Sequence, residues 1–420
     1  MKETAIVVGA GLGGMTTALS LAFHGFKEIR IYEKSTKILN PIGAGLGIQG
    51  ATLCLDKMNL THVWKKVGHP VYEARVTAGH EKLSSLNIKK LLGGTVLEDH
   101  FMMTKRNALM KELWAECEKN PKIKTKLGVK VTEYKNTDSG AEITFADGTT
   151  DSADIVVSAD GIHSIGRDFV DPDCPPPEHS GLCVFYCLLK DIDKERFPDN
   201  STLELHLNMG MAMVMRVSET DGMIVVAHQA SEKWNVDSQK WTFDVSPQIF
   251  HELMEDHDFY KEQDWIDEKM IKNVHCLSHL GIYQQPHVSN WYKGNVILVG
   301  DAAHATSPFM GQGANQAMID GYYLGRCLNE SEDVPTAFEK FFKARDATTR
   351  KIINSSKELG HMRTGTSFWN RIKRSGVRFG LRIASNVGMN LAEDQMRKFM
   401  LGNMVPSFMN EDEFLESEIN

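Results

Sequence analysis

A glycine-rich turn near the N-terminus has the spacing of a phosphate-binding site. Gly9, Gly11 and Gly14 fit the pattern G-x-G-x-x-G, between a β-branched run over residues 4–8 and a helical pattern over residues 15–23. Glycines placed in this way allow a tight turn and let backbone N–H groups at a helix N-terminus approach a pyrophosphate. Glu33 ends the next predicted strand, 24 residues after Gly9, where it can accept a hydrogen bond from a ribose 2′-hydroxyl. Because this acid disfavours a 2′-phosphate, the pattern indicates FAD or NAD rather than NADP as the bound dinucleotide.

A second glycine-rich stretch, residues 45–50, also fits the spacing but is not expected to form a dinucleotide-binding turn. Asn40 and Pro41 stand where the preceding buried strand would have to be. Glycine in a strand often lets another group lie close to the backbone. We therefore expect Gly45 to lie in a strand that a flat ligand can approach.

The segment from Trp291 to Gly321 has the most specific pattern in the chain. Asp301 follows a predicted buried strand over residues 296–299. Pro308 then begins a loop with many backbone N–H donors, and a helix is predicted to start near Ala314. In α/β sheets, ligands bind at the carboxyl ends of the strands, and a helix N-terminus stabilises negative charge. The segment therefore predicts a ligand site around Asp301.

Three motifs in order resemble those of the FAD-dependent class A flavoprotein monooxygenases, the family of para-hydroxybenzoate and salicylate hydroxylases. They are the glycine turn at Gly9, the sequence Ala159-Asp160-Gly161 that runs on to Arg167, and Gly300-Asp301 followed by Pro308. The resemblance extends from residue 1 to about residue 360. It implies an oxidoreductase with FAD as cofactor and NAD(P)H as co-substrate.

The resemblance also implies a role for each matching residue. Glu33 would hold the adenosine ribose, Val131 the adenine through its backbone, and Arg106 the FAD phosphate and ribose region. Asp301 would hold the ribityl hydroxyls, and Gly45 would lie near the flavin ring. Asp160 and Arg167 would lie on the pyrophosphate side, where the family handles NAD(P)H. Backbone N–H groups at the flavin N1 and C2 oxygen would come from the loop and helix start after Pro308, namely Gly311, Gln312, Gly313, Ala314 and Asn315.

By this resemblance the chain would hydroxylate an aromatic or polycyclic small molecule with O2, through a flavin C4a-hydroperoxide. Three alternatives remain open: a flavin-dependent halogenase, an FAD-linked reductase of the same fold, and a flavin-binding regulatory protein. The halogenase segment Gly-x-Trp-x-Trp-x-Ile-Pro is absent. Residues 214–216 read Val-Met-Arg where salicylate hydroxylase-like members often have His-Tyr-Pro, which argues against a simple phenolic acid as substrate. Residues 319–320 read Ile-Asp instead of the common Glu-Asp, a change expected to affect helix packing more than flavin binding.

Methionines define the predicted substrate side. In residues 207–217 every odd position is apolar, and four of these positions are methionine, which would give one strand face an adaptable apolar wall. The wall can line a pocket or belong to a core. Arg216 and His228 are candidate substrate contacts, and no other catalytic residue is assigned.

The elements that position these residues define an α/β protein. We expect a Rossmann-like FAD-binding domain from residues 1–72, 101–175 and 282–355, interrupted by a β-sheet substrate domain from residues 73–100 and 176–281. Residues 356–420 would form a C-terminal helical region. In the substrate domain, residues 201–217 and 223–228 are the predicted strands.

Composition narrows the classes further. The chain has 420 residues, 42% of them hydrophobic, and a net charge of −8, which excludes a disordered protein and argues against nucleic acid as a partner. The seven cysteines form no CxxC pair, so free thiols and a cytoplasmic location are expected. The group His275, Cys276 and His279 lacks a fourth ligand at suitable spacing, and no metal is expected.

Positive charge is concentrated near the C-terminus. Residues 361–382 contain six lysines and arginines and no acid, so the rest of the chain carries −14. Arg371, Arg374, Arg378 and Arg382 follow helical spacing beside an apolar stripe. Such a helix can contact an anionic membrane surface, but docking on the body of the enzyme is the favoured interpretation. Beyond the small-molecule aromatic substrate and O2, no partner is assigned, and the oligomeric state is left open.

Overall fold

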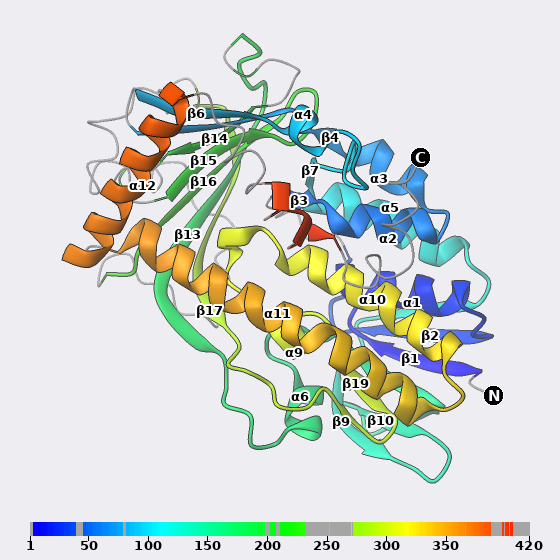
Figure 1. Ribbon diagram of the computed structural model, residues 1–420. Coiled ribbons are helices and arrows are strands. Elements are labelled where there is room, and N and C mark those ends of the chain that lie inside the picture. The colour runs from blue at the N-terminus through cyan, green and yellow to red at the C-terminus, as the bar shows by residue number, and fades with distance from the viewer. Residues whose placement is uncertain are drawn as a thin grey trace.

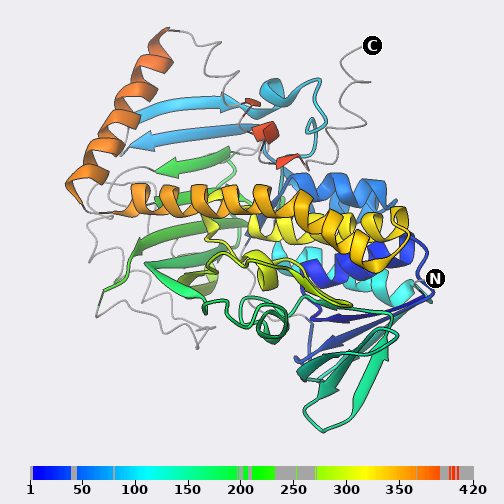
Figure 2. The same ribbon diagram turned by 60° about the horizontal axis from the view of Figure 1, so that its bottom comes forward.

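The computed structural model describes residues 3–38, 45–78, 81–195, 202–206, 211–231, 272–365 and 367–387, with isolated residues at 197, 252 and 270 and between 397 and 405. Within these ranges the chain is an α/β protein with a large parallel sheet, a large mostly antiparallel sheet and two small sheets. The long helices run across and beside both large sheets (Figures 1 and 2).

The mainly parallel sheet has the strand order β18-β19-β12-β1-β2-β8, in which only the pair β18 and β19 is antiparallel. Its centre, β1 (Thr4–Val8) between β12 (Ile155–Ser158) and β2 (Glu28–Glu33), is built from β-branched residues that are buried, as expected for a sheet covered on both faces. The strand predicted over residues 4–8 is thus confirmed, the predicted strand that ends at Glu33 is found, and the strand predicted over residues 296–299 is found over residues 296–298. The remaining strands are β8 (Ile123–Leu127), β18 (Tyr292–Lys293) and β19 (Val296–Leu298).

Two helices from opposite ends of the chain pack closely over this sheet. They are α1 (Leu12–Phe23) and α10 (Gly313–Glu330), which lie together in both views (Figures 1 and 2). A Cβ atom on Gly321 would lie 2.6 Å from the Thr17 nitrogen, and one on Gly13 would lie 3.1 Å from the Cβ of Ala317. Glycine is therefore needed at this crossing because the two backbones almost touch.

The second large sheet has the order β17-β13-β16-β15-β14-β5-β6. Its neighbours are antiparallel except β14 and β5, which are parallel. The strand predicted over residues 201–217 is instead two strands that pair antiparallel, β14 (Thr202–His206) and β15 (Met211–Arg216). Residues 207–210, which include Leu207 and Met209, lie outside the described residues. The other strands are β5 (Glu73–Ala78), β6 (Glu81–Asn87), β13 (Glu178–Leu189), β16 (Gly222–Gln229) and β17 (Val274–Gln284).

Smaller elements connect the two large sheets. The sheet β3-β7-β4 contains β3 (Gly45–Ile48), β7 (Met102–Lys105) and β4 (His69–Pro70), and the sheet β11-β10-β9 contains β9 (Val131–Asn136), β10 (Ala141–Phe145) and β11 (Thr150–Ala153). The helices are α2 (Gly50–Lys57), α3 (Thr61–Val67), α4 (Ile88–Leu92), α5 (Arg106–Lys119), α6 (Ile165–Val170) and α9 (Asp301–His304), with the short 3₁₀ helix η1 (Pro308–Met310). Strands β5 and β6 belong to the same sheet as strands β13 to β17, and the division into domains stays a prediction.

Two long helices follow α10 along the chain. The helix α11 (Val334–Thr364) crosses the molecule, and α12 (Phe368–Val387) lies at its edge (Figure 1). Arg374 joins them, because its guanidinium donates to the carbonyl oxygens of Met362 and Gly365 at the end of α11. Residues 368–387 form a helix, in agreement with the predicted helical spacing, and its side chains Trp369 and Phe379 are 70% and 65% exposed. Membrane contact through this helix stays a prediction.

Two chain-wide expectations can be compared with the structure. All seven cysteine thiols are free of disulfides. Among the helices that the structure describes, none combines the length and the apolar composition needed to cross a bilayer.

Candidate functional site

The first glycine turn has the geometry of a phosphate cradle. Gly9 has φ +103°, and a Cβ on it would collide with the Ala159 carbonyl oxygen. A Cβ on Gly14 would collide with the Gly9 carbonyl oxygen, whereas one on Gly11 would meet nothing within 4 Å. Gly9 thus closes the turn, Gly14 lets α1 pack against β1, and Gly11 leaves space at the start of the helix. These are the three separate uses of glycine expected in a dinucleotide-binding turn.

This difference between Gly11 and Gly14 leads to a paired prediction. We expect Gly14→Ala to destabilise the fold, because its methyl group meets backbone that cannot move independently. Gly11→Ala should change the free energy of unfolding by no more than about 0.5 kcal/mol but should weaken FAD retention, because the methyl group enters the space left for phosphate. Denaturant unfolding and the flavin-to-protein absorbance ratio measure the two effects. Full flavin content in folded Gly11→Ala would contradict the assignment of this space.

Glu33 lies at the end of β2 beside the same turn. Its carboxylate accepts hydrogen bonds of 2.8 Å from the backbone N–H groups of Ala10 and Ser35. The chain passes this point again at Val129, whose N–H donates to the Glu33 carbonyl oxygen, and β9 then begins at Val131. The structure thus brings Glu33 and the start of β9 to one side of the glycine turn. Their contacts with ribose and adenine stay predictions.

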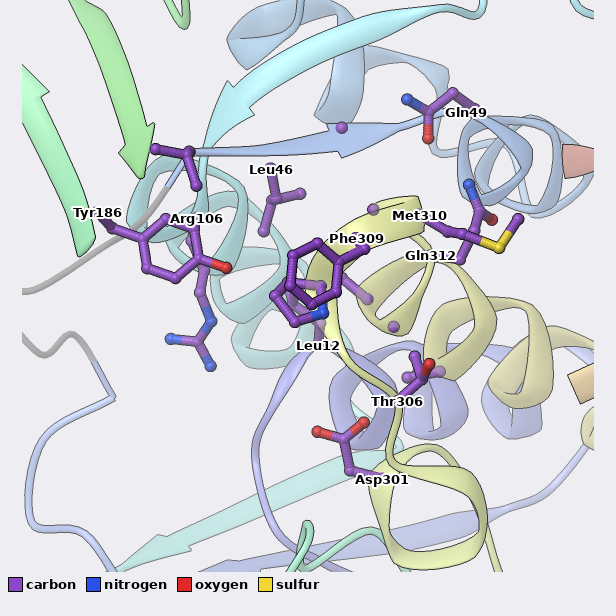
Figure 3. Close-up of a pocket in the computed structure, with 18 of the residues that line it drawn as sticks. Leu12, Leu46, Gln49, Arg106, Tyr186, Asp301, Thr306, Phe309, Met310 and Gln312 are labelled. Carbon is purple, nitrogen blue, oxygen red and sulfur yellow. The ribbon is translucent and has the colours of Figure 1, made fainter. Parts of the chain in front are cut away.

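A cavity of about 610 Å³ extends from this turn to the antiparallel sheet. At its base, Asp301 at the start of α9 and Arg106 at the start of α5 project toward the same space (Figure 3). Burial raises the pKa of Asp301, while the charges of His304 and Arg106 partly oppose the increase. Burial lowers the pKa of Arg106, and Asp301 counteracts that change. A carboxylate and a guanidinium therefore face one cavity, where hydroxyl and phosphate groups can bind them.

A buried charge network holds Asp301 in position. Asp320 on α10 accepts from the Gly300 N–H at 2.8 Å, from His304 Nε2 at 2.5 Å and from Arg345 Nε at 2.7 Å. Burial alone would raise the pKa of Asp320, but the attraction of His304 and Arg345 and these hydrogen bonds outweigh burial and lower it. Gly300, with φ +60°, is thus anchored directly before Asp301. Ile319 is also buried, in line with a packing role for the Ile-Asp pair.

The start of α10 presents backbone donors to the cavity. Gly311 has the left-handed φ of +63° required by the turn after η1, and α10 begins at Gly313 without a side-chain cap. Because the first N–H groups of a helix have no partner within it, this end can stabilise an anion. The predicted residues Pro308, Gly311, Gln312, Gly313 and Ala314 all line the cavity.

Asn315 has a further role that sequence motifs did not reveal. Its Oδ1 accepts from the Gln49 N–H at 2.9 Å, and its Nδ2 donates to the Gly47 carbonyl at 2.8 Å. The side chain is fully buried. Asn315 therefore fixes the second glycine-rich segment against the start of α10.

The second glycine-rich segment meets the antiparallel sheet at Gly45. A Cβ here would lie 2.6 Å from Val217 and 2.8 Å from the Met223 sulfur, so only glycine allows this contact. The sheet presents an apolar wall to the cavity, with Met213 and Met215 from β15 among its residues, as expected for a pocket wall. Further apolar lining residues are Leu12, Leu46, Phe101, Met103, Ala159, Val184, Met223, Val225, Ala227, Val299, Phe309, Met310, Ala314, Ala317, Leu359 and Met404.

Several predicted residues lie elsewhere. Asp160 accepts hydrogen bonds from Ser158 and from the N–H groups of Ile165 and Gly166. Arg167 is buried and donates to the carbonyl oxygens of Ile162 and Ala302. Both therefore brace the turn before α6, and neither lines the cavity. Their proposed roles toward NAD(P)H and pyrophosphate stay predictions.

Arg216 and His228 lie on the face of the antiparallel sheet that points away from the cavity. Arg216 donates to the Phe197 carbonyl oxygen and is 1% exposed. Their strand neighbours Met215 and Ala227 line the cavity instead. The structure therefore does not bring either predicted substrate contact to the pocket.

Tyr186 and Arg363 are among the polar cavity residues that the sequence did not indicate. Tyr186 on β13 points into the cavity in Figure 3, and burial raises the pKa of its hydroxyl, which stays protonated. Arg363 lies near the end of α11, where burial lowers the pKa of its guanidinium to about 10. Alternation along β13 could have identified Tyr186, because Val184, Tyr186 and Leu188 share one face. No local motif marks Arg363.

The fold and this cavity define a dinucleotide-binding oxidoreductase of the flavoprotein class. A family model described as FAD binding domain matches residues 2–336. The chain is 27% identical over 365 residues to the putative FAD-dependent monooxygenase YetM of Bacillus subtilis, covering 84% of this chain and 92% of that protein. It is 24% identical over 373 residues to 3-hydroxybenzoate 6-hydroxylase of Klebsiella oxytoca, covering 85% and 88%.

Solved structures agree on the fold. Klebsiella pneumoniae HpxO complexed with FAD and uric acid superposes with a TM-score of 0.81 at 19% identity, covering 95% of this chain and 97% of that one. The chain belongs to the FAD-binding domain family of class A flavin-dependent aromatic hydroxylases. It is an oxidoreductase, and FAD is its cofactor.

Proposed function

We propose that the chain is a single-component hydroxylase that uses NAD(P)H and O2 to insert one oxygen atom into an aromatic or polycyclic small molecule. The main support is the continuous cavity, which joins the glycine turn, Asp301 and the start of α10 to an apolar wall on the antiparallel sheet. The cavity has a polar end that suits a dinucleotide and an apolar end that suits a planar substrate, and the two ends are continuous. The family membership supports the same reading.

The chain offers the groups that FAD requires. The space at Gly11, the N–H groups at the start of α10, and the carboxylate of Asp301 would hold its phosphates, flavin ring and ribityl chain. When bound, FAD supplies the redox chemistry: NAD(P)H reduces the flavin, and O2 then yields one oxygen atom for the substrate and one for water. The protein binds and orients the substrate and excludes water from the apolar part of the cavity.

The apolar wall also indicates the kind of substrate. Met213, Met215 and Met223 are flexible and polarizable side chains, which adapt to ligands of irregular shape. Tyr186 adds one hydroxyl that can orient a polar substituent. These residues support a mostly apolar ring system with few polar groups as substrate.

A compound screen tests the proposal. Purified protein should be yellow, and candidate aromatic compounds should accelerate NADPH or NADH oxidation with a product mass higher by one oxygen atom. A halogenated product, or a reduced one without added oxygen, would support the competing enzyme classes. A yellow protein that neither nicotinamide reduces would overturn the proposal in favour of a flavin-binding regulatory protein.

Tyr186→Phe provides a narrower test of the substrate side. We expect unchanged flavin content and a loss of about 2- to 10-fold in kcat/KM, the range for one neutral hydrogen bond. Tyr283→Phe is the matched control, because Tyr283 lies on β17 and does not line the cavity. Equal kinetics for both variants would remove Tyr186 from the substrate site.

A further inference from the structure

Three buried side chains with metal-binding atoms converge on the antiparallel sheet, on the face that points away from the cavity. They are Cys183 on β13, His228 on β16 and His279 on β17, and one ligand atom from each lies within 4.8 Å of the other two. All three side chains are buried, with exposed fractions of 0%, 3% and 7%. Among the residues that the structure describes, no carboxylate and no further histidine or cysteine joins the group. The three are defined here as the His-His-Cys cluster.

The strand pairing brings the cluster together. Cys183 is directly opposite His228 in the β13–β16 ladder, and His279 is opposite Phe185, two residues along β13. Residues two apart on a strand point to the same face, so all three side chains meet on one side of the sheet. The Phe185 ring stacks on His279 with a centroid distance of 4.0 Å and an interplanar angle of 6°. The sheet therefore fixes both the positions and one ring plane of the cluster.

The His228 imidazole is oriented as a metal ligand is. Its Nδ1 lies 2.8 Å from the Gln229 carbonyl oxygen, so the proton is on Nδ1, and Nε2, which faces His279 Nε2, carries the lone pair. A metal-binding histidine typically makes this bond through its other nitrogen. The two Nε2 atoms are 3.2 Å apart, close to the separation of about 3.3 Å for two nitrogens on one tetrahedral zinc ion at 2.0–2.1 Å. The Cys183 sulfur lies within 4.8 Å of both nitrogens, which is up to about 1.2 Å more than the S–N separation of about 3.6 Å at a tetrahedral zinc ion.

We propose that Cys183, His228 and His279 form a site for a thiophilic divalent metal ion, with Zn²⁺ as the ion in the cell. Nitrogen and thiolate ligands select zinc over magnesium or calcium, which prefer oxygen. Sequence spacing argued against a metal because it compared His279 with its neighbours His275 and Cys276. The partners of His279 lie instead on two other strands, about 50 and 100 residues away.

The cluster has a structural consequence for the cavity. Val184 and Tyr186 on β13, and Ala227 on β16, are strand neighbours of the cluster residues and line the cavity on the other face. A metal ion that links β13, β16 and β17 would restrain the strands that form the substrate wall. The inference does not depend on which substrate the wall binds.

Metal binding by the full FAD-loaded protein tests this inference. After dialysis against a chelator, the protein is equilibrated with Zn²⁺ and its metal content is measured by elemental mass spectrometry. We expect one zinc per chain, with affinity at least about 100-fold weaker in Cys183→Ser and His279→Gln. Cys187→Ser is the matched control, because Cys187 lies on the same strand and face, is fully buried and is outside the cluster. It should keep the zinc.

A second measurement covers the case in which a variant does not fold, which loss of bound flavin would reveal. The unmodified protein with Co²⁺ should show ligand-field bands at longer wavelength than the flavin absorption and a thiolate charge-transfer band. Absence of these bands, or equal zinc affinity in Cys183→Ser and Cys187→Ser, would overturn the inference. The cluster would then be a hydrogen-bonded histidine pair beside a thiol.

Discussion

Asp320→Asn is expected to lower the free energy of unfolding by about 3–5 kcal/mol, the usual cost of leaving a buried charge without its partner. Asp320 is fully buried and pairs with Arg345, which is 1% exposed, and with His304. The amide keeps the shape of the side chain but removes the charge that balances Arg345. The variant should also retain less FAD, because Asp320 anchors the Gly300 turn that carries Asp301. Denaturant unfolding followed by far-UV circular dichroism measures the loss.

A surface pair on α11 serves as the control for this prediction. Glu339 and Lys343 form an exposed ion pair, so Glu339→Gln should cost no more than about 0.5 kcal/mol. Similar unfolding midpoints for the two variants would show that the buried network adds nothing beyond a surface pair.

The same carboxylate predicts how the difference depends on pH. The pKa of Asp320 is lowered in the folded state, so its contribution is complete above the unfolded value of about 4 and is lost as the pH falls through the folded value. The gap in stability between the unmodified protein and Asp320→Asn should therefore be constant near neutral pH and shrink below about pH 4. A gap that grows on acidification would contradict this assignment.

Asp301→Ala is expected to weaken FAD binding by about 10- to 100-fold while leaving the apoprotein as stable as before. A hydrogen bond to a charged group contributes about 1.5–3 kcal/mol, which corresponds to this change in affinity. Burial raises the pKa of Asp301, so ionising this carboxyl group is unfavourable in the folded protein. Removing the group should therefore change the stability of the apoprotein little. Flavin release on dilution gives the affinity, and thermal unfolding of the flavin-free protein gives the stability.

The pattern of the two effects separates a binding role from a structural one. Asp320→Asn should reduce stability and flavin content together, whereas Asp301→Ala should reduce flavin content alone. Full flavin occupancy in Asp301→Ala would remove Asp301 from the binding site.

The parallel sheet and its ligand-facing turns could be predicted because their determinants are local. Gly9, Gly11 and Gly14 follow a β-branched run, and Asp301 follows another, so each turn is specified by a few neighbouring residues. The loop from Pro308 to Ala314 was placed at the cavity for the same reason. Where one strand and the following helix form the site, the local sequence was enough to predict the site residues.

The residues that contact the substrate could be predicted only in part, because adjacent residues of a strand point to opposite faces of the sheet. Met213 and Met215 were assigned to one strand face and do line the cavity, but Arg216 was proposed as a contact although it has the opposite parity. A shift of one residue reverses the face of every side chain in a strand. His228 points away from the cavity for this reason and meets His279.

Contacts between distant segments were beyond the reach of local patterns. Asn315 bonds to Gly47 across 268 residues, and Arg345 reaches Asp320 from a different helix. From the sequence, Asn315 was expected only to contact the flavin through its backbone, and Arg345 was not singled out. The partners of both side chains become neighbours only after the sheets have assembled.

The close crossing of α1 and α10 bears on how the protein is made. Gly13 on α1 is synthesised about 300 residues before Ala317 and Gly321, which pack against α1. Nascent chains that end before residue 313 contain the phosphate turn without the helix start that completes the flavin site. Long-range contacts of this kind slow folding, because loop closure must precede their stabilising effect. The flavin site is therefore complete only when the start of α10 has packed against α1.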